Sequence, residues 1–391
     1  MDIMPLELVQ KFAEAYGPTT AAVHTFFSPG RVNLIGEHID YNGGYVFPAA
    51  LTLGIHAAVR VRTDKVIRVR SVNAEGEVSF AIDKDLKYNA ADGWANYPKG
   101  VIAALAAAGH KLVGADVLYW GNLPDGAGLS SSAAIEVLTG YWALTLSKTQ
   151  TVDRVALAQL CQKVENQFVG VNCGIMDQFA VAVGKRDHAI LLDCATLKYE
   201  LVPSAMPGYN LIILNTNKRR ELADSKYNER RAECDKALEL LKKAYPTTPM
   251  ANLCAATMAQ IEATITDPIL SKRAKHVVTE NQRVVKAVEV LKAGDLIGFG
   301  QLLNASHQSL CDDYEVTGDH LDAIVAAAQA QPGCLGARMT GAGFGGCGLA
   351  VVSVAETDAF IANVGRAYTA KTGLIAGFYI SQVGDGARAQ S

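Results

Sequence analysis

The chain of 391 residues is long enough for two packed domains with a large apolar core. Its formal charge of −3 comes from 36 basic and 39 acidic residues without a long run of either sign, which excludes the basic surface of a nucleic-acid-binding protein. Although 50% of the residues are apolar, no run approaches the roughly 18 that a membrane span needs. Residues 1–12 lack the basic and apolar segments of a signal peptide, so we expect a cytoplasmic protein that binds neither membranes nor nucleic acid.

The first half of the chain alternates predicted strands and helices. Apolar periodicity predicts a short helix at residues 6–16. Strands are then expected within residues 24–48 and at 51–61, 66–72, 77–82 and 115–120, and helices at 94–107, after residue 130 and at 152–168. The chain thus begins with a sheet-rich region that later helices cover.

The second half is rich in predicted helices. Met206-Pro207-Gly208 interrupts the pattern, and the apolar strand at 209–214 starts a second domain, which gives domains of residues 1–205 and 206–391. Helices are expected at 224–244, 256–265, 271–293, 295–312, 319–330 and 356–372, and strands within 337–354 and at 375–380.

The eight cysteines are widely spaced and form no C-x-x-C pair. In a chain of this size, such spacing favours reduced, mostly buried thiols over a disulfide framework or a zinc site.

A glycine- and serine-rich loop leads into a predicted helix at Gly126-Ala-Gly-Leu-Ser-Ser-Ser132. The start of a helix leaves about four backbone N–H groups without intrahelical partners, and these groups attract anions. Glycines let the backbone wrap phosphate oxygens, and serine hydroxyls can bind phosphate or Mg²⁺. The loop is therefore either a phosphate site or an ordinary serine-capped helix.

A second glycine-rich run, Gly341-Ala-Gly-Phe-Gly-Gly346, fits the G-x-G-x-x-G pattern. A strand follows it where the dinucleotide fingerprint requires a helix, so we reject a Rossmann site. The run is either a tight turn or a place where a ligand or another loop comes close to the backbone. The sequence contains no G-x-x-x-x-G-K-[ST], which excludes a P-loop enzyme.

Two groups of polar residues suggest a ligand pocket. Arg31, Glu37, His38 and Asp40 lie within ten residues among apolar and glycine residues, and such a cluster suits a ligand rich in hydroxyl groups. Taken singly, Asp40 could form a turn and His38 could be a core histidine. Of Glu165 and Asp177, which flank a loop, one could hold Mg²⁺ and the other could face a substrate hydroxyl, unless both are surface carboxylates.

Together these stretches resemble the galactokinase family of the GHMP kinase superfamily. The matching motifs, in chain order, are Pro29-Gly-Arg-Val-Asn-Leu-Ile-Gly-Glu-His-Ile-Asp-Tyr41, Gly126-Ala-Gly-Leu-Ser-Ser-Ser-Ala-Ala134, Cys173-Gly-Ile-Met-Asp-Gln178 and Met339-Thr-Gly-Ala-Gly-Phe-Gly-Gly-Cys347. Ser28 and Ala342 stand where relatives often have alanine and glycine. The resemblance spans residues 24 to 383 and implies an α+β fold of two domains. The N-terminal one would be like domain 2 of ribosomal protein S5 and the C-terminal one ferredoxin-like, with the active site in the cleft between them.

The resemblance also implies transfer of the γ-phosphoryl group of ATP to the anomeric C1 hydroxyl of galactose. Asp177 would accept the hydroxyl proton, and Arg31 would stabilise the developing alkoxide and keep Asp177 ionised. Because a neighbouring cation weakens a carboxylate as a base, positioning and charge neutralisation are expected to carry most of the catalysis. The implied sugar-binding residues are Arg31, Glu37, His38, Asp40, Gly174, Asp177 and Tyr227.

For the nucleotide, the resemblance implies that Trp94 and Tyr97 line the adenine pocket and that Ser132 and Glu165 hold Mg²⁺. The implied phosphate-binding residues are Gly126, Ala127, Gly128, Leu129, Ser130, Ser131 and Ser132. Two alternatives stay open: a kinase for a related sugar, N-acetylgalactosamine or arabinose, and a non-catalytic galactose-sensing regulator on the same scaffold. The expected substrates are small molecules, and the expected oligomeric state is a monomer.

Overall fold

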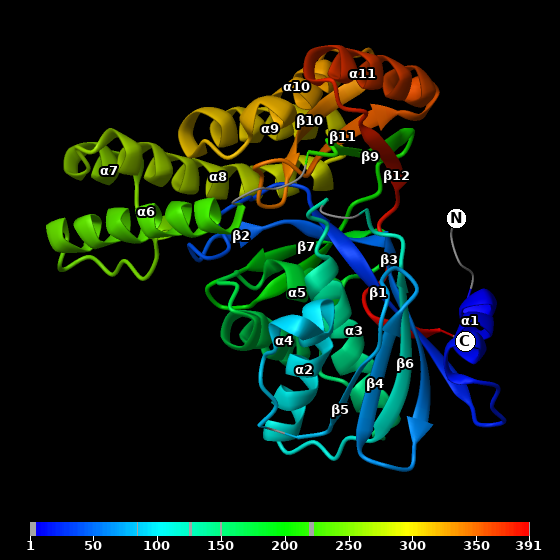
Figure 1. The fold of residues 1–391 in the computed structure, drawn as a ribbon. Coiled ribbons are helices and arrows are strands. Elements are labelled where there is room, and N and C mark those ends of the chain that lie inside the picture. Colours follow the sequence, from blue (N-terminus) through cyan, green and yellow to red (C-terminus); the bar gives the residue numbers. More distant parts are fainter. Residues whose placement is uncertain (1–4, 84, 125–126, 149–150, 219–222, 391) are drawn as a thin grey trace.

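The computed structural model describes residues 5–83, 85–124, 127–148, 151–218 and 223–390 (Figure 1). The strands are β1 (Val23–Asn33), β2 (Tyr45–Val46), β3 (Pro48–Arg62), β4 (Val66–Ser71), β5 (Val78–Ala81), β6 (Gly114–Gly121), β7 (His188–Asp193), β8 (Tyr199–Pro203), β9 (Tyr209–Asn215), β10 (Cys334–Thr340), β11 (Cys347–Ser353), β12 (Gly377–Ser381) and β13 (Arg388–Gln390). The α-helices are α1 (Pro5–Tyr16), α2 (Asn96–Ala107), α3 (Ser131–Leu146), α4 (Arg154–Val164), α5 (Met176–Val183), α6 (Ala223–Ala244), α7 (Met258–Thr264), α8 (Pro268–Lys292), α9 (Leu296–Ser309), α10 (Gly318–Gln329) and α11 (Thr357–Thr372). Short 3₁₀ turns occur at Ala90–Ala95, Leu253–Ala255 and Val354–Glu356, and π-helical turns at Glu165–Val169 and Leu310–Tyr314.

The first sheet has six strands in the order β13-β1-β3-β6-β4-β5. Successive side chains of a strand point to opposite faces, and β3 and β6 carry apolar residues on both. Ala57 and Val59 belong to the main core, whereas Ala58 and Leu118 pack with Phe12 of α1. Helix α1 therefore covers one face of this sheet, and the helices from α2 to α5 lie on the other side (Figure 1).

The second sheet has four antiparallel strands in the order β10-β11-β9-β12. One face, with Ile212 and Leu214, packs against α10 and α11. The opposite face, with Leu211 and Ile213, belongs to the main core that also contains the first sheet. The expected α+β class is confirmed, and the two halves share one continuous core.

The chain crosses between the two halves more often than a boundary at residue 206 suggests. Strand β13 pairs with β1 in antiparallel register, Thr25 opposite Gln390. Residues 388–390, which fall in the expected domain of residues 206–391, therefore add an edge strand to the first sheet. The strands β2, β7 and β8 form a small third sheet in that order.

The apolar periodicity predicts most of these elements correctly. Two predicted helices of the first half are shorter than expected. The 3₁₀ turn at Ala90–Ala95 takes the first two residues of the helix predicted at 94–107, and the π turn at Glu165–Val169 takes the end of the helix predicted at 152–168. Helix α5 and strands β7, β8 and β13 were not predicted. All eight cysteines are free, as expected, but only Cys161, Cys234 and Cys347 are buried, so the expectation of mostly buried thiols is wrong. Within the described ranges, no helix is both long and apolar enough to span a membrane.

Candidate functional site

Arg31 reaches the site from a bulge in β1. The register between β1 and β3 shifts between Pro29 and Arg31, and such a bulge redirects the side chain that follows it. A Cβ atom at Gly30 would lie 2.7 Å from the carbonyl oxygen of Leu129, so the close approach of the serine loop requires glycine here. The backbone N–H of Arg31 donates to the same carbonyl at 3.1 Å. The first strand and the serine loop are thus held together at Arg31.

Arg31 and Asp177 form a bidentate ion pair. Nε of Arg31 donates to Oδ1 of Asp177 at 2.9 Å and Nη2 to Oδ2 at 2.8 Å, while Nη1 donates to the carbonyl of Gly128 at 2.7 Å. The hydroxyl of Ser130 also donates to Oδ2 of Asp177, at 2.6 Å. Asp177 lies in the first turn of α5. Three donors therefore fix the carboxylate in one orientation beside the serine loop.

The serine loop does not form the side-chain cap that its sequence suggests. Ser130, the residue before α3, has a left-handed backbone with φ of 64°, and its side chain makes no cap bond because it binds Asp177. Ser131 is exposed and Ser132 half-buried. The first amide groups of α3 consequently have no side-chain cap, which suits an anion such as phosphate. Gly126 lies outside the described residues, and Ala127 and Leu129, which belong to the loop, are buried.

A cluster of polar side chains with oxygen atoms lies near this loop. Glu165, in the π turn after α4, is 6% exposed, and Nε2 of Gln178 donates to it at 2.5 Å. Gln178 also contacts Glu136 of α3, at 3.5 Å. Burial, together with the nearby Asp177 charge, raises the pKa of Glu165 to about 7, although a hydrogen bond with Ser132 opposes the shift.

The chemistry of this cluster fits a hard divalent cation. Oε1 of Glu136 and Oε1 of Gln178 are buried without a hydrogen-bond partner among the described residues. Glu136 has a pKa raised well above its ordinary value, first by burial and then by Glu165. A nearby cation would offset this excess of buried negative charge. No three His, Cys, Asp or Glu side chains meet at one metal position in the described part of the chain. A site with only one or two protein ligands is typical of the Mg²⁺ in kinases, where substrate phosphates supply the other ligands.

Glu37 connects the loop after β1 to the second glycine-rich run. Its Oε1 accepts from the backbone N–H of Gly341 at 2.7 Å and from the Thr340 hydroxyl at 3.2 Å. The buried Arg338 guanidinium lies 3.6 Å from the same oxygen. Burial nevertheless raises the pKa of Glu37, although Arg338 and Arg31 oppose the shift. A Cβ atom at Gly343 would also collide with the carbonyl oxygen of Val316, so this run contains a glycine that the close approach of another segment requires.

Both ring nitrogens of His38 already have protein partners. Nε2 lies 3.1 Å from the carbonyl oxygen of Ala342, and Nδ1 lies 2.9 Å from the hydroxyl of Tyr41. The residue is 3% exposed, and burial is the main reason that its pKa falls to about 3. The ring is thus neutral, and protein groups hold both of its nitrogens.

Asp40 and Gly174 lie side by side, and Tyr227 lies against the loop that carries Asp40. Asp40 and Gly174 line a pocket of about 360 Å³ whose polar lining includes Gln162, Asn166 and Arg231. A Cβ atom at Gly174 would collide with the Asp40 carboxylate. Burial, followed by the charge of Asp177, raises the pKa of Asp40 to about 7. The Tyr227 ring lies 5.4 Å, between centroids, from the ring of Tyr41, the residue after Asp40. Burial raises the pKa of Tyr227, and the charges of Asp40 and Asp177 add to the shift.

Trp94 and Tyr97 occupy the junction between the 3₁₀ turn at 90–95 and α2. The ring of Trp94 meets that of Tyr119 edge to face, with centroids 5.8 Å apart. Both residues are half-buried and pack against the main core. The two residues therefore lie on the core side of the turn before α2, where Trp94 packs against β6, the strand that leads into the serine loop.

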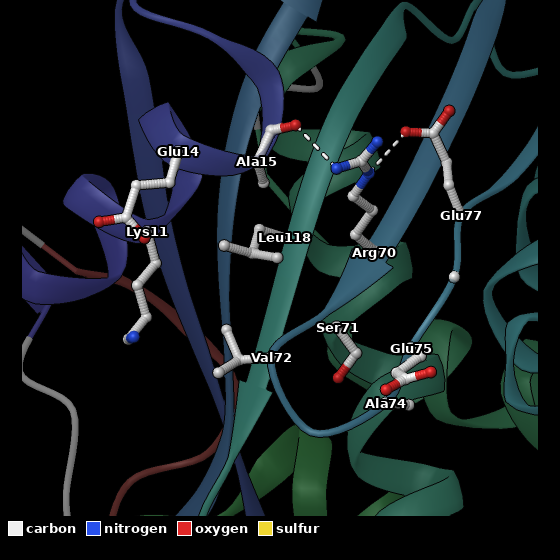
Figure 2. Close-up of a pocket in the computed structure, with 11 residues that line it drawn as sticks. Lys11, Glu14, Ala15, Arg70, Ser71, Val72, Ala74, Glu75, Glu77 and Leu118 are labelled. Atoms are coloured by element: carbon white, nitrogen blue, oxygen red, sulfur yellow. Dashed lines mark hydrogen bonds and ion pairs between the residues drawn. The ribbon is translucent and has the colours of Figure 1, made fainter.

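A different cavity, of about 570 Å³, lies far from these residues. It is lined by α1 and the strands β4 and β6, and Figure 2 shows Arg70 joined to Glu77 and to the carbonyl of Ala15 across it. Both acidic and basic side chains line it, and the guanidinium of Arg70 already binds Glu77 and the carbonyl of Ala15. We assign no function to this cavity.

Comparison with known proteins agrees with this geometry. The model described as the galactokinase galactose-binding signature matches residues 10–61, the GHMP kinases N terminal domain matches 96–185 and the GHMP kinases C terminal model matches 287–370. The galactokinase of Enterococcus faecalis is 53% identical over 97% of this chain and 98% of its own length. The chain belongs to the galactokinase family. The galactokinase of Fusobacterium nucleatum is 52% identical over the same shares of the two chains.

Solved structures extend the comparison to the fold. The crystal structure of Lactococcus lactis galactokinase complexed with galactose superposes with a TM-score of 0.92, at 47% identity, and the match covers 97% of this chain and 98% of that one. Mevalonate kinase from Methanococcus jannaschii superposes with a TM-score of 0.67 at 16% identity, which shows a shared fold alone.

Sequence reasoning missed several residues that shape the site. Gln178 stands inside a quoted motif, but only the structure shows that its amide joins two carboxylates. Glu136 is one helical turn beyond the serines, where an acidic residue in an otherwise apolar helix was the available signal. Tyr314 and Arg338 come from distant parts of the chain, and no local pattern marks them.

Proposed function

We infer that this protein transfers the γ-phosphoryl group of ATP to the C1 hydroxyl of D-galactose, giving galactose 1-phosphate and ADP. The observation that carries the proposal is the Arg31 and Asp177 ion pair held beside the open start of α3. A fixed carboxylate and cation next to a phosphate-binding loop provide what phosphoryl transfer to a hydroxyl needs. The galactose-bound Lactococcus lactis relative supports the choice of sugar.

In the proposed step, the C1 oxygen forms a bond to the γ-phosphorus and the bond from that phosphorus to the bridging oxygen breaks, so that ADP leaves. Asp177 accepts the proton of the C1 hydroxyl. Because Arg31 and Ser130 both donate to Asp177, the carboxylate is held in one orientation. In a loose transition state, orientation and positive charge contribute more than early proton removal.

We propose that Asp40, Glu37, Tyr227 and the backbone at Gly174 recognise the sugar hydroxyls, with His38 holding this loop in place. Carboxylates accept hydrogen bonds from hydroxyl groups in a fixed geometry. A site built for the axial 4-hydroxyl leaves its own groups unpaired when glucose binds, which rejects the epimer. We also propose that the adenine lies against Trp94 and Tyr97.

We propose that Ser132 and Glu165 hold Mg²⁺ together with the phosphates of ATP. Bound there, the metal would neutralise charge on the transferred phosphoryl group. Because the pKa of Glu165 is raised to about 7, metal binding there at neutral pH would release a proton. We further propose that the protein acts as a cytoplasmic monomer, which size-exclusion chromatography with light scattering would test.

The test of this function is ADP release by the purified protein with Mg·ATP and, in parallel, galactose, glucose, N-acetylgalactosamine and arabinose. Turnover with galactose and not with glucose is the expected result. Turnover with another sugar instead would keep the kinase reaction and overturn the sugar assignment. If calorimetry shows galactose binding but no sugar gives turnover, the proposed kinase activity is overturned and a sugar sensor is favoured.

A further inference from the structure

A chain of hydrogen bonds runs from the second glycine-rich run through His38 and Tyr41, in the loop after β1, to helix α6. The carbonyl oxygen of Ala342 lies 3.1 Å from Nε2 of His38, and Nδ1 of His38 lies 2.9 Å from the Tyr41 hydroxyl. The Tyr41 and Tyr314 hydroxyls are 2.8 Å apart, and the Tyr314 hydroxyl is 3.1 Å from Sγ of Cys234. Five groups from four separate segments are therefore joined in sequence.

The carbonyl of Ala342 fixes the direction of every bond in this chain. A carbonyl can only accept, so Nε2 of His38 carries the proton and Nδ1 must accept from Tyr41. The Tyr41 oxygen then accepts from the Tyr314 hydroxyl, and the Tyr314 oxygen accepts from the thiol of Cys234. Each hydroxyl donates once and accepts once, which is the arrangement in which buried polar groups stabilise one another.

Helix α6 connects this chain to Tyr227. Tyr227, Arg230 and Cys234 are spaced three and four residues apart and so share one face of α6. Nε of Arg230 donates to the carbonyl of Tyr314 at 2.8 Å. The Tyr227 ring lies 5.5 Å from the ring of His38, between centroids. The face of α6 that carries Tyr227 is therefore fixed by its contacts with Tyr314.

Tyr314 is suited to hold this position. It ends a π-helical turn, is fully buried, and its ring lies 5.0 Å from the ring of His38. A π turn inserts an extra residue into a helix and often occurs at functional sites. Here it brings the tyrosine hydroxyl from the C-terminal half of the chain to Tyr41 in the N-terminal half.

We propose that Tyr314 is a positioning residue for sugar recognition, which acts through Tyr41 and His38 on the loop that carries Asp40, and through α6 on Tyr227. Tyr314 touches no reacting atom; it fixes the geometry in which Asp40 and Tyr227 meet the sugar hydroxyls. The inference rests on the proposed function, because it assigns these hydroxyls to galactose.

The test is galactose and ATP binding by Tyr314→Phe, measured separately by calorimetry. The substitution keeps the ring and removes one hydroxyl, which leaves the Tyr41 oxygen without its donor. We expect galactose affinity to fall about tenfold and ATP affinity to stay within about twofold, because an unmade buried hydrogen bond has an effect of this order. Tyr41→Phe provides a second variant, and the double variant should lose less affinity than the product of the two single losses.

Tyr368→Phe is the matched control. Tyr368 is also fully buried, and its hydroxyl donates to the carbonyl of Thr216 at 2.8 Å in the packing of α11. The control should lower the melting temperature about as much as Tyr314→Phe without changing galactose affinity. Equal galactose binding by wild type and Tyr314→Phe, or an equal loss in the control, would overturn the positioning role alone. Absence of galactose binding in the wild type would overturn the proposed function, and this inference with it.

Discussion

Arg31 and Asp177 form an ion pair whose two partners differ in exposure, 5% for the arginine side chain and 30% for the aspartate. The guanidinium is enclosed by Asp177 and the carbonyl of Gly128, whereas the carboxylate keeps an open edge. A substrate hydroxyl can therefore reach Asp177 while the cation stays fixed behind it. This arrangement separates the two functions that we propose, proton acceptance and charge stabilisation.

Asp177→Asn should abolish most turnover and spare sugar binding. The amide keeps the size of the side chain but cannot accept the proton, and loss of a general base typically lowers kcat by about 10²- to 10⁴-fold. Steady-state ADP release gives kcat, and calorimetry gives the galactose Kd, which should change by no more than a few-fold. A variant rate within a few-fold of wild type would remove Asp177 from the role of base.

Arg31→Lys should be nearly as damaging, even though the charge is kept. Lysine presents a point charge and cannot make the two parallel bonds to Asp177 together with the bond to Gly128. We expect kcat to fall about 10²-fold, the order seen when one preorganised donor is lost. Arg60→Lys is the control, since Arg60 pairs with Asp116 in a separate cluster of arginines. A similar loss in both variants would point to folding rather than to catalysis.

Glu165→Gln should weaken the apparent affinity for Mg²⁺ about tenfold or more, because a neutral amide is a poorer ligand for a hard cation than a carboxylate. Galactose affinity, measured without nucleotide or metal, should stay unchanged. The measurement is ADP release as a function of Mg²⁺ at fixed ATP, with Glu289→Gln, an exposed residue paired with Lys286, as control. An unchanged Mg²⁺ dependence would exclude Glu165 as a metal ligand.

The sequence predicts the parts of this site that are local and leaves out those that depend on distant contacts. The helix after the serine loop follows from apolar periodicity, and α3 extends over Ser131–Leu146 as expected. The same pattern suggests a serine cap, which is wrong because Asp177, 47 residues away, competes for the Ser130 hydroxyl. A side chain that binds its own backbone in isolation can bind a stronger acceptor once the chain has folded.

The role of His38 shows the same limit. Its position between Glu37 and Asp40 suggests a polar pocket residue, yet its partner Ala342 is 304 residues away.

Strand β13 has only three residues, and its pairing with β1 joins the two ends of the chain. Short strands carry little periodicity, so their existence depends on the sheet that they join.

Gly174→Ala should impair sugar binding without a comparable loss of nucleotide binding. A methyl group at this position would collide with the Asp40 carboxylate and displace it. We expect the galactose KM to rise about tenfold or more and the ATP KM to stay nearly constant, because overpacking at a built site shifts the groups around it. Gly365→Ala is the control, since its nearest neighbour would be a Phe378 ring atom at 3.3 Å, far from the site. An unchanged galactose KM would show that the Asp40 position does not govern sugar affinity.

Asp40→Asn should change the pH dependence of stability in a defined direction. The pKa of Asp40 is raised from 3.8 to about 7 in the folded protein, first by burial and then by Asp177. A carboxyl group with a raised folded pKa stabilises the fold fully below its unfolded pKa, and this contribution is lost as the pH rises through about 7. At pH 5 the folded protein keeps Asp40 neutral, as asparagine would be. At pH 8 it must hold a buried charge, which asparagine does not carry.

The melting temperature of Asp40→Asn, relative to wild type, should therefore rise between pH 5 and pH 8 in the absence of ligands. The buried histidines, such as His276 with a pKa lowered to about 4, titrate in both proteins and largely cancel in this difference. Asp177→Asn removes the charge of Asp177, which is the second cause of the raised Asp40 pKa. When both compared proteins carry Asp177→Asn, the change that Asp40→Asn makes in the pH dependence of the melting temperature should therefore be smaller. A difference that stays constant with pH would mean that Asp40 titrates near its ordinary value.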